Sequence, residues 1–401
     1  MRAKARNAGR GVALRAQIAA IAGVAAITVT AGCAVVKRPP TDVATLRAEG
    51  VAAAAAYQEE MAAVVERLAQ RAVRRGDGKL DILLLSGGGQ SGAFGAGFLR
   101  GWRARAADPM PTFDLVTGIS AGALQAPFAF LGTEEATERN ARLFRNENGK
   151  MEPKADFLFW LRRTGGVVKT DGFNETLKET YNASLASSLA PGFADGRQIL
   201  VGTTDADLGI GRMWDVREEL DRSDGVERLQ RVLLASTAVP GYFPPVLLDG
   251  HLHFDGSVMG NFLTVLDLEQ YRRLAARLRE LGAGAVTVRL WAILNVFPHA
   301  DIKVMPPEEA TSLALRATYL LYWAQQPEIL RGLAERAAAA NAELDGLEVE
   351  LRYTGVPDEL SSDPKADKLF DAEWTKRIEQ LGYERALGDS PWDPIPSAFA
   401  R

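Results

Sequence analysis

The sequence has few of the residues that build cross-links and metal sites. Its 401 residues include one cysteine and three histidines. A single cysteine excludes a disulfide framework and a cysteine-based zinc site, and three histidines predict against a histidine-rich metal centre. The composition, 47% hydrophobic and 24% charged, excludes wholesale disorder and collagen-like repeats. We therefore expect a globular protein without a metal centre.

The chain also has no excess of positive charge. Its formal net charge is −4, which predicts against nucleic acid as a partner. Residues 1–32 hold five cations and no acid, so the remainder has 42 cations against 51 acids and a net charge of −9. An acidic body is not attracted to anionic lipid head groups. Any attachment to a membrane is therefore expected to come from the N-terminus.

The N-terminus is typical of a bacterial signal peptide. A basic segment, residues 1–15, is followed by an apolar run over residues 17–31. Thr30-Ala31-Gly32-Cys33 then resembles a lipobox, before whose cysteine a signal peptidase cleaves and whose thiol carries diacylglycerol. Small Ala31 and Gly32 fit this pattern, and the sole cysteine, Cys33, stands where it requires one. Thr30 departs from the usual leucine.

Two alternatives to lipidation remain open at this terminus. An ordinary signal peptidase could cleave after Ala31, or residues 16–36 could stay uncleaved, because they are about long enough to span a membrane. All three interpretations place the body outside the cytoplasm. We expect residues 1–32 to be a lipoprotein-type signal peptide. The mature chain is then expected in the cell envelope, anchored to the outer membrane through lipidated Cys33.

The remaining chain divides into three parts. Residues 33–78 are expected to form a linker and a helical stalk, because residues 41–75 are rich in Ala, Glu and Arg and contain no proline. From Leu80, short apolar runs alternate with helical patterns, which predicts an α/β sheet with helices on both faces. We assign residues 79–300 to this catalytic domain and 301–401 to a mainly helical C-terminal extension. The expected strands are 82–85, 113–117, 198–203, 246–248, 251–254 and 285–296, with a further candidate strand at 347–353. The expected helices are 93–107, 121–131, 226–238 and 266–281, with mostly helical stretches at 307–345 and 367–387.

A glycine-rich loop follows the first strand and opens a helix. It reads Ser86-Gly87-Gly88-Gly89-Gln90-Ser91-Gly92. Glycines permit sharp turns, and the N–H groups at a helix N-terminus form an anion site. The anion could be a phosphate or a transient oxyanion. A dinucleotide site is disfavoured, because the next strand ends in Gly118-Ile119-Ser120 rather than in an acid.

The second motif is Gly118-Ile119-Ser120-Ala121-Gly122, between an apolar strand and a helix. This is the context of a nucleophile elbow, in which a tight turn exposes the serine hydroxyl at the sheet edge. Ser120 could also cap the following helix. A serine needs a base to take its proton. Asp255, in Phe254-Asp255-Gly256-Ser257, is the candidate, and burial would have to raise its pKa for that task.

Together these motifs resemble the patatin-like phospholipase family, over roughly residues 80–261. The segment 233–245, LLASTAVPGYFPP, also resembles one that the family carries just before its catalytic aspartate. The resemblance implies a three-layer α/β/α sandwich with a mostly parallel central sheet. It also implies a serine acyl hydrolase, of lipid esterase or phospholipase A type, that needs no cofactor and acts on lipid or phospholipid esters.

The resemblance also implies the roles of individual residues. Ser120 would be the nucleophile and Asp255 the general base of a dyad without histidine. Gly87, Gly88 and Gly89 would supply the oxyanion N–H donors. Gly92, Gly118, Gly122 and Gly256 complete the motifs. Two positions depart from the family pattern, since Ser91 replaces the usual loop cation and Ser257 the usual Gly or Ala.

Two other interpretations remain open. Ser120, Asp255 and His299 occur in the chain order of an α/β-hydrolase triad, although only one clear strand precedes the elbow. The chain could also be a non-catalytic lipid-binding lipoprotein, an interpretation motivated by the missing loop cation.

Overall fold

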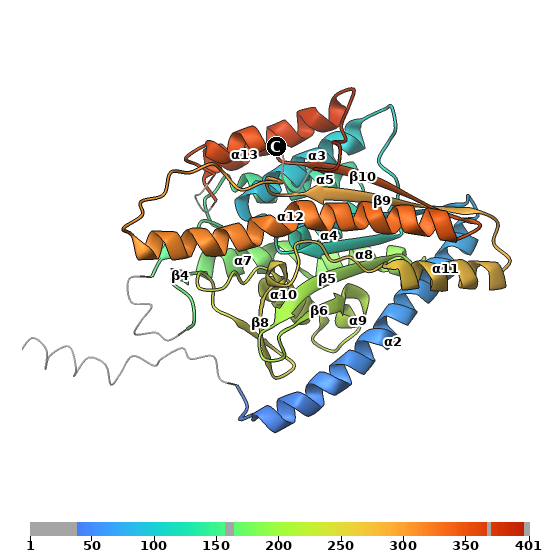
Figure 1. Ribbon diagram of the computed structural model, residues 1–401, viewed down its shortest axis with the longest axis horizontal. Helices are drawn as coiled ribbons and strands as arrows, with labels where there is room; N and C mark the ends of the chain where they lie inside the picture. Colours follow the sequence, from blue (N-terminus) through green and yellow to red (C-terminus); the bar gives the residue numbers. More distant parts are fainter. Residues whose placement is uncertain (1–37, 157–163, 367–369, 397–401) are drawn as a thin grey trace, which may run out of the picture.

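The computed structural model describes residues 38–156, 164–366 and 370–396 (Figure 1). The predicted signal peptide, Cys33 and the candidate span 16–36 lie outside these residues. Within them, no helix is both long enough and apolar enough to cross a membrane.

A central sheet of eight strands organises the chain. The strands of this sheet are β1 (Lys79–Leu85), β2 (Leu115–Ile119), β5 (Gln198–Asp205), β6 (Ile210–Asp215), β7 (Val246–Leu248), β8 (His251–Asp255), β9 (Val286–Leu294) and β10 (Leu347–Gly355). A separate two-stranded ribbon joins β3 (Lys154–Ala155) to β4 (Val168–Lys169).

The sheet is mostly parallel. Its order is β10-β9-β1-β2-β5-β8-β7, with β6 paired to β5. The strands from β10 to β5 in this order run parallel to their neighbours, whereas β6, β7 and β8 pair antiparallel. The predicted mostly parallel sheet is confirmed.

The helices lie around this sheet. They are α2 (Val43–Arg75), α3 (Gly92–Ala104), α4 (Ala121–Leu131), α5 (Glu134–Arg145), α7 (Asp171–Thr180), α8 (Ala183–Ala194), α9 (Val216–Leu220), α10 (Gly225–Ser236), α11 (Leu268–Glu280), α12 (Ala310–Glu343) and α13 (Ala372–Leu387). Short 3-10 turns are η1 (Gly89–Ser91), η2 (Gly256–Val258) and η3 (Asp358–Ser362).

Strand β1 shows why helices cover both faces of the sheet. Six of its seven residues are fully buried, as expected for a central parallel strand. Ile82 and Leu84 face α11 and α12, where they lie near Tyr271 and Leu333. Leu83 lies opposite Trp291, whose ring contacts Trp102 of α3 at 4.9 Å between centroids. Since successive side chains point to opposite faces, α3 lies on one side and α11 and α12 on the other.

The central sheet continues beyond residue 300, where the sequence predicted the end of the catalytic domain. Strand β10 pairs in parallel with β9 along all nine of its residues. Helix α13 packs tightly on α3, where a Cβ on Gly97 or Gly101 would overlap its backbone. The C-terminal residues therefore supply the predicted helices and also a strand of the central sheet.

The predicted stalk is partly wrong. Helix α2 is a single helix, and its first half is exposed, but its second half buries Met61, Val64 and Leu68 in the core. Arg71 and Arg75 then reach the buried carboxylate of Asp114 at 2.8 and 2.7 Å. The apolar stripe and these ion pairs attach the second half of the helix to the body.

Candidate active site

The glycine-rich loop lies directly against the predicted nucleophile. A Cβ on Gly87 would come within 3.0 Å of Ser120 Cβ and 2.7 Å of Asn261 Oδ1, and a Cβ on Gly88 would overlap the Asn295 carbonyl oxygen. Asn295, at the end of β9, fixes the loop by donating from its amide nitrogen to the Ser86 carbonyl at 2.7 Å. These glycines are required for close packing between the loop and its neighbours.

Ser120 has the strained conformation of a nucleophile elbow. It joins β2 to α4 with φ 52° and ψ −120°, a conformation that non-glycine residues rarely adopt. The flanking glycines permit this turn, because a Cβ on Gly118 would overlap the backbone of Gly122, and one on Gly122 would overlap that of Leu85. The turn presents the serine side chain beside the glycine-rich loop.

Ser236 supports the elbow from α10. The Ser120 N–H donates to Ser236 Oγ at 2.9 Å, and this hydroxyl donates in turn to the Gly202 carbonyl at 2.7 Å. Ser236 is fully buried. Ser236 was not among the predicted site residues, although it lies in the segment that resembles the one before the family's catalytic aspartate.

Strand pairing brings Asp255 to Ser120. Ile119, which precedes the serine, lies opposite Gly202 of β5, and Thr203 lies opposite Asp255 of β8. The Asp255 backbone is fixed on both sides. Its N–H donates to the Ala238 carbonyl at 2.9 Å, and its carbonyl accepts from Thr204 Oγ1 at 2.9 Å. The aspartate is thus positioned by the end of the sheet.

The Asp255 carboxylate is buried and incompletely hydrogen-bonded. Its side chain is 1% exposed; Oδ1 accepts from the Ser257 N–H at 2.9 Å, and Oδ2 has no partner among the described residues. Burial raises the pKa of Asp255 to about 6, against the lowering effects of Ser120 and Ser257. Asp255 Oδ2 makes no hydrogen bond that meets the usual geometric limits. The contact between the Ser120 hydroxyl and the Asp255 carboxylate is therefore longer or less well aligned than a standard hydrogen bond. Such contacts are often long before substrate binds.

The loop offers N–H groups beside Ser120. The Gly87 N–H is already donated to the Asn261 carbonyl at 3.3 Å, so in this conformation it is not available to an oxyanion. The N–H groups of Gly88 and Gly89 make no hydrogen bond within the part of the chain that the structure describes. The Gly89 Cα faces open space, since a Cβ there would meet nothing within 4 Å. Two of the three predicted donors therefore remain free.

Helix α12 closes the site. Its Gln326 accepts from the side-chain amide of Asn261 at 2.8 Å, and both residues are fully buried. The pKa of Tyr322 is raised, chiefly by burial and also by the negative charge of Asp255. Ser120 is only 6% exposed. No residue of α12 was among the site residues predicted from the sequence.

The histidine of the alternative triad has another carboxylate partner. His299 Nδ1 pairs with Asp358 Oδ2 of η3 at 2.6 Å. His253 lies two residues before Asp255, where its Nδ1 contacts Thr203 Oγ1 at 3.0 Å and burial lowers its pKa to about 4. It is therefore neutral at physiological pH. The groups that lower the pKa of Asp255 are the hydroxyls of Ser120 and Ser257 and the Ser257 backbone N–H, rather than a histidine.

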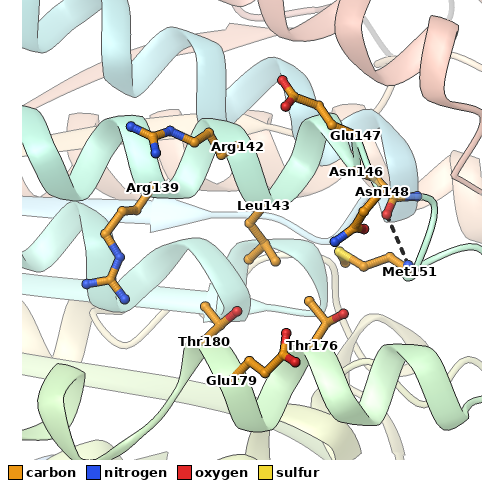
Figure 2. A pocket seen from close by; sticks show the side chains of 10 residues that line it. All are labelled: Arg139, Arg142, Leu143, Asn146, Glu147, Asn148, Met151, Thr176, Glu179 and Thr180. Carbon is orange, nitrogen blue, oxygen red and sulfur yellow. Dashed lines mark hydrogen bonds between the residues drawn. The ribbon is translucent and has the colours of Figure 1, made fainter.

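A pocket of about 400 Å³ lies elsewhere, between α5 and α7 (Figure 2). Its lining mixes both charges, with Arg139 and Arg142 on α5 and Glu179 on α7. Glu179 pairs with Lys150 at 3.2 Å. No predicted site residue lines this pocket. The chemistry predicted from the sequence is therefore located at the dyad and not here.

Comparisons with known proteins match the part of the chain that holds the dyad. A cGAMP-activated phospholipase of Pseudomonas aeruginosa is 26% identical over 224 residues, which are 52% of this chain and 62% of that protein. The crystal structure of VipD from Legionella pneumophila aligns over 77% of this chain and 66% of that one, at 11% identity and a TM-score of 0.33, a likeness too weak to carry an argument. Residues 83–266 match the model of the patatin-like phospholipase family. Residues 83–266, which include both Ser120 and Asp255, are therefore similar to the patatin-like phospholipase family, a family of lipid hydrolases.

Proposed function

We propose that this protein is a serine acyl hydrolase that cleaves carboxylic esters of lipids through a Ser120–Asp255 dyad and an acyl-enzyme. The observation that carries the proposal is the pairing of a strained elbow serine with a buried aspartate whose pKa is raised to about 6. A base of that pKa accepts a proton better than an ordinary aspartate and is still ionised at neutral pH. The name of the Pseudomonas relative and the matching family model support a phospholipid as the substrate.

The first chemical step forms the acyl-enzyme. Ser120 Oγ attacks the ester carbonyl carbon while Asp255 takes the hydroxyl proton, and the alcohol portion leaves with that proton. The free N–H groups of Gly88 and Gly89 would stabilise the oxyanion, an interaction typically worth about 2.7–4 kcal/mol per donor. The cation missing at Ser91 is not needed for these backbone donors.

The second step releases the acid. Water attacks the acyl-Ser120 carbonyl, with Asp255 again accepting a proton and then returning it to Ser120 Oγ. The same oxyanion donors serve both steps. No metal or organic cofactor takes part in this scheme.

Hydrolysis of p-nitrophenyl butyrate and of phosphatidylcholine vesicles tests the proposal. We expect Ser120→Ala and Asp255→Ala each to lower kcat by roughly a thousandfold or more, and His299→Ala to retain activity. Loss of activity in a folded His299→Ala protein would transfer the assignment to the triad. A wild-type protein that neither hydrolyses an ester nor reacts with a fluorophosphonate probe would support the non-catalytic lipid-binding alternative.

We further propose that Cys33 is lipidated and holds the body in the cell envelope, outside the cytoplasm and at the outer membrane. The position of the sole cysteine after a basic and then an apolar segment supports this. Metabolic labelling with an alkyne fatty acid should mark the wild type and not Cys33→Ser. An unlabelled wild-type chain in the soluble fraction would contradict the proposal.

A further inference from the structure

The outer face of the first half of α12 is apolar and exposed. Leu313, Leu320 and Leu321 are 39%, 42% and 70% exposed. The other fully described exposed side chains between residues 310 and 326 are alanines: Ala310, Ala314, Ala317 and Ala324. Arg316 is the single charged residue of this stretch, and its charge is matched by a salt bridge to Asp301. We call Leu313, Leu320 and Leu321 the α12 stripe.

This pattern is unusual for a helix on the surface of a protein in water. A surface helix normally pairs an apolar inner face with a charged outer one. Here the inner face is also apolar, since Trp323 is buried against Phe297 with ring centroids 5.9 Å apart. Contiguous exposed apolar surface marks an interaction site. The α12 stripe is therefore expected to contact a partner surface.

More exposed apolar side chains follow Asp255 in the sequence. Val258 and Met259, three and four residues after Asp255, are 45% and 53% exposed. Ile302 and Val304, in the segment that leads into α12, are 82% and 97% exposed. Most of the large exposed apolar residues of the described chain after residue 250 thus belong to α12, to its approach or to η2.

The α12 stripe is joined to the catalytic centre through the helix itself. Leu321 lies five residues before Gln326, which accepts a hydrogen bond from the Asn261 side chain, and the Asn261 carbonyl accepts one from the Gly87 N–H of the glycine-rich loop. Helix α12 runs along the outside of the molecule in Figure 1. One face of this helix therefore closes the dyad, while the opposite face is apolar and open to solvent.

We propose that the α12 stripe is the surface by which this protein rests on an uncharged or zwitterionic lipid surface. The proposal rests on the proposed function, because a lipid ester is presented by such a surface. The charge of the stripe also indicates the kind of lipid surface. With its single cation neutralised, the stripe offers apolar area and no attraction for anionic head groups, so the association is expected to be insensitive to salt. Contact at this helix would bring the lipid to the face that covers Ser120.

A fluorescent probe on the stripe tests the contact directly. Because the chain has a single cysteine, a Cys33→Ser background lets one new cysteine be labelled. The probe, the environment-sensitive dye NBD, is attached at Leu320→Cys. Leu387→Cys, at the end of α13, is the matched control, since the two leucines are 42% and 44% exposed. The full chain also carries Ser120→Ala, so that phosphatidylcholine vesicles stay intact.

We expect the Leu320 probe to shift to the blue on vesicles and to be quenched by nitroxide-labelled phosphatidylcholine, while the Leu387 probe is not. Equal behaviour of the two probes would overturn the proposal. A blue shift that grows with protein concentration without vesicles would assign the stripe to a second copy of the chain, and would overturn it as well.

Activity measured in parallel separates this proposal from the proposed function. In the otherwise wild-type protein, Leu320→Ser with Leu321→Ser should lower vesicle hydrolysis about tenfold relative to p-nitrophenyl butyrate hydrolysis, whereas Leu387→Ser should not. An unchanged ratio would contradict the docking surface and leave the hydrolase intact. If the Leu320 probe is quenched but the wild-type chain hydrolyses no ester, the docking surface is retained and the hydrolase function is refuted.

Discussion

Replacing Asp255 by asparagine should inactivate the protein and stabilise it. Oδ1 already accepts one hydrogen bond, which asparagine can keep, and Oδ2 has no partner among the described residues. The negative charge, in contrast, is held in a site that is 1% exposed. The folded protein therefore bears the cost of an ionised carboxylate that water would solvate in the unfolded chain.

The magnitude follows from the pKa. A rise of the Asp255 pKa from 3.8 to about 6 corresponds to a cost of up to about 3 kcal/mol above pH 7. The folded state binds the proton more tightly than the unfolded state, so between these two values stability falls as pH rises. At pH 8 the free energy of unfolding of Asp255→Asn should therefore exceed that of the wild type by up to about 3 kcal/mol, so this variant should unfold at a higher denaturant concentration. Near pH 4 the difference in free energy should shrink to a few tenths of its value at pH 8.

Urea unfolding at pH 8 and pH 4 measures this difference, with Ser120→Ala as a second inactive variant that keeps the carboxylate. Asp114 is the contrasting aspartate. It is also buried, but it is held by Arg71 and Arg75, so Asp114→Asn should destabilise the fold by about 3–5 kcal/mol. The reasoning would be refuted if Asp255→Asn were no more stable than the wild type at pH 8. It would also be refuted if the gain in free energy of unfolding were the same at pH 8 and at pH 4.

Three further outcomes follow from the site. On a soluble ester, kcat/KM should rise with pH to a plateau with its midpoint near pH 6, because Asp255 must be ionised to act as a base; a flat profile from pH 5 to 8 would argue against that role. Gly88→Ala should be poorly folded because its Cβ overlaps a backbone carbonyl, whereas Gly89→Ala, at φ 53° in open space, should cost only about 1–2 kcal/mol in urea unfolding. Ser236→Ala leaves the Ser120 N–H without its acceptor, so stability should fall by about 1–3 kcal/mol and kcat should decrease more than KM changes; an unaltered kcat would remove Ser236 from the support of the elbow.

The sequence did not reveal the local elements α5, α7, α8, β6 and α9, and it also did not reveal the placements that depend on distant contacts. The strand over residues 347–353 was expected only as a possibility within an extension, yet it completes the sheet beside β9. Helix α2 was expected to be a stalk, but its arginines find carboxylates on the body. In both cases the local pattern predicted the element correctly, while its place depended on partners tens of residues away.

By itself, the sequence determined the order of strands and helices around three motifs, and with them Ser120 and Asp255 as the residues to examine. Such features are local, because a glycine turn, an apolar run and a helical period each act within a few residues. Only the tertiary structure decided that β5 brings these two residues together, that Ser236 and Asn261 support them, and that α12 covers them. It also decided the raised pKa of Asp255, since burial depends on everything packed around a side chain and not on its neighbours in the sequence.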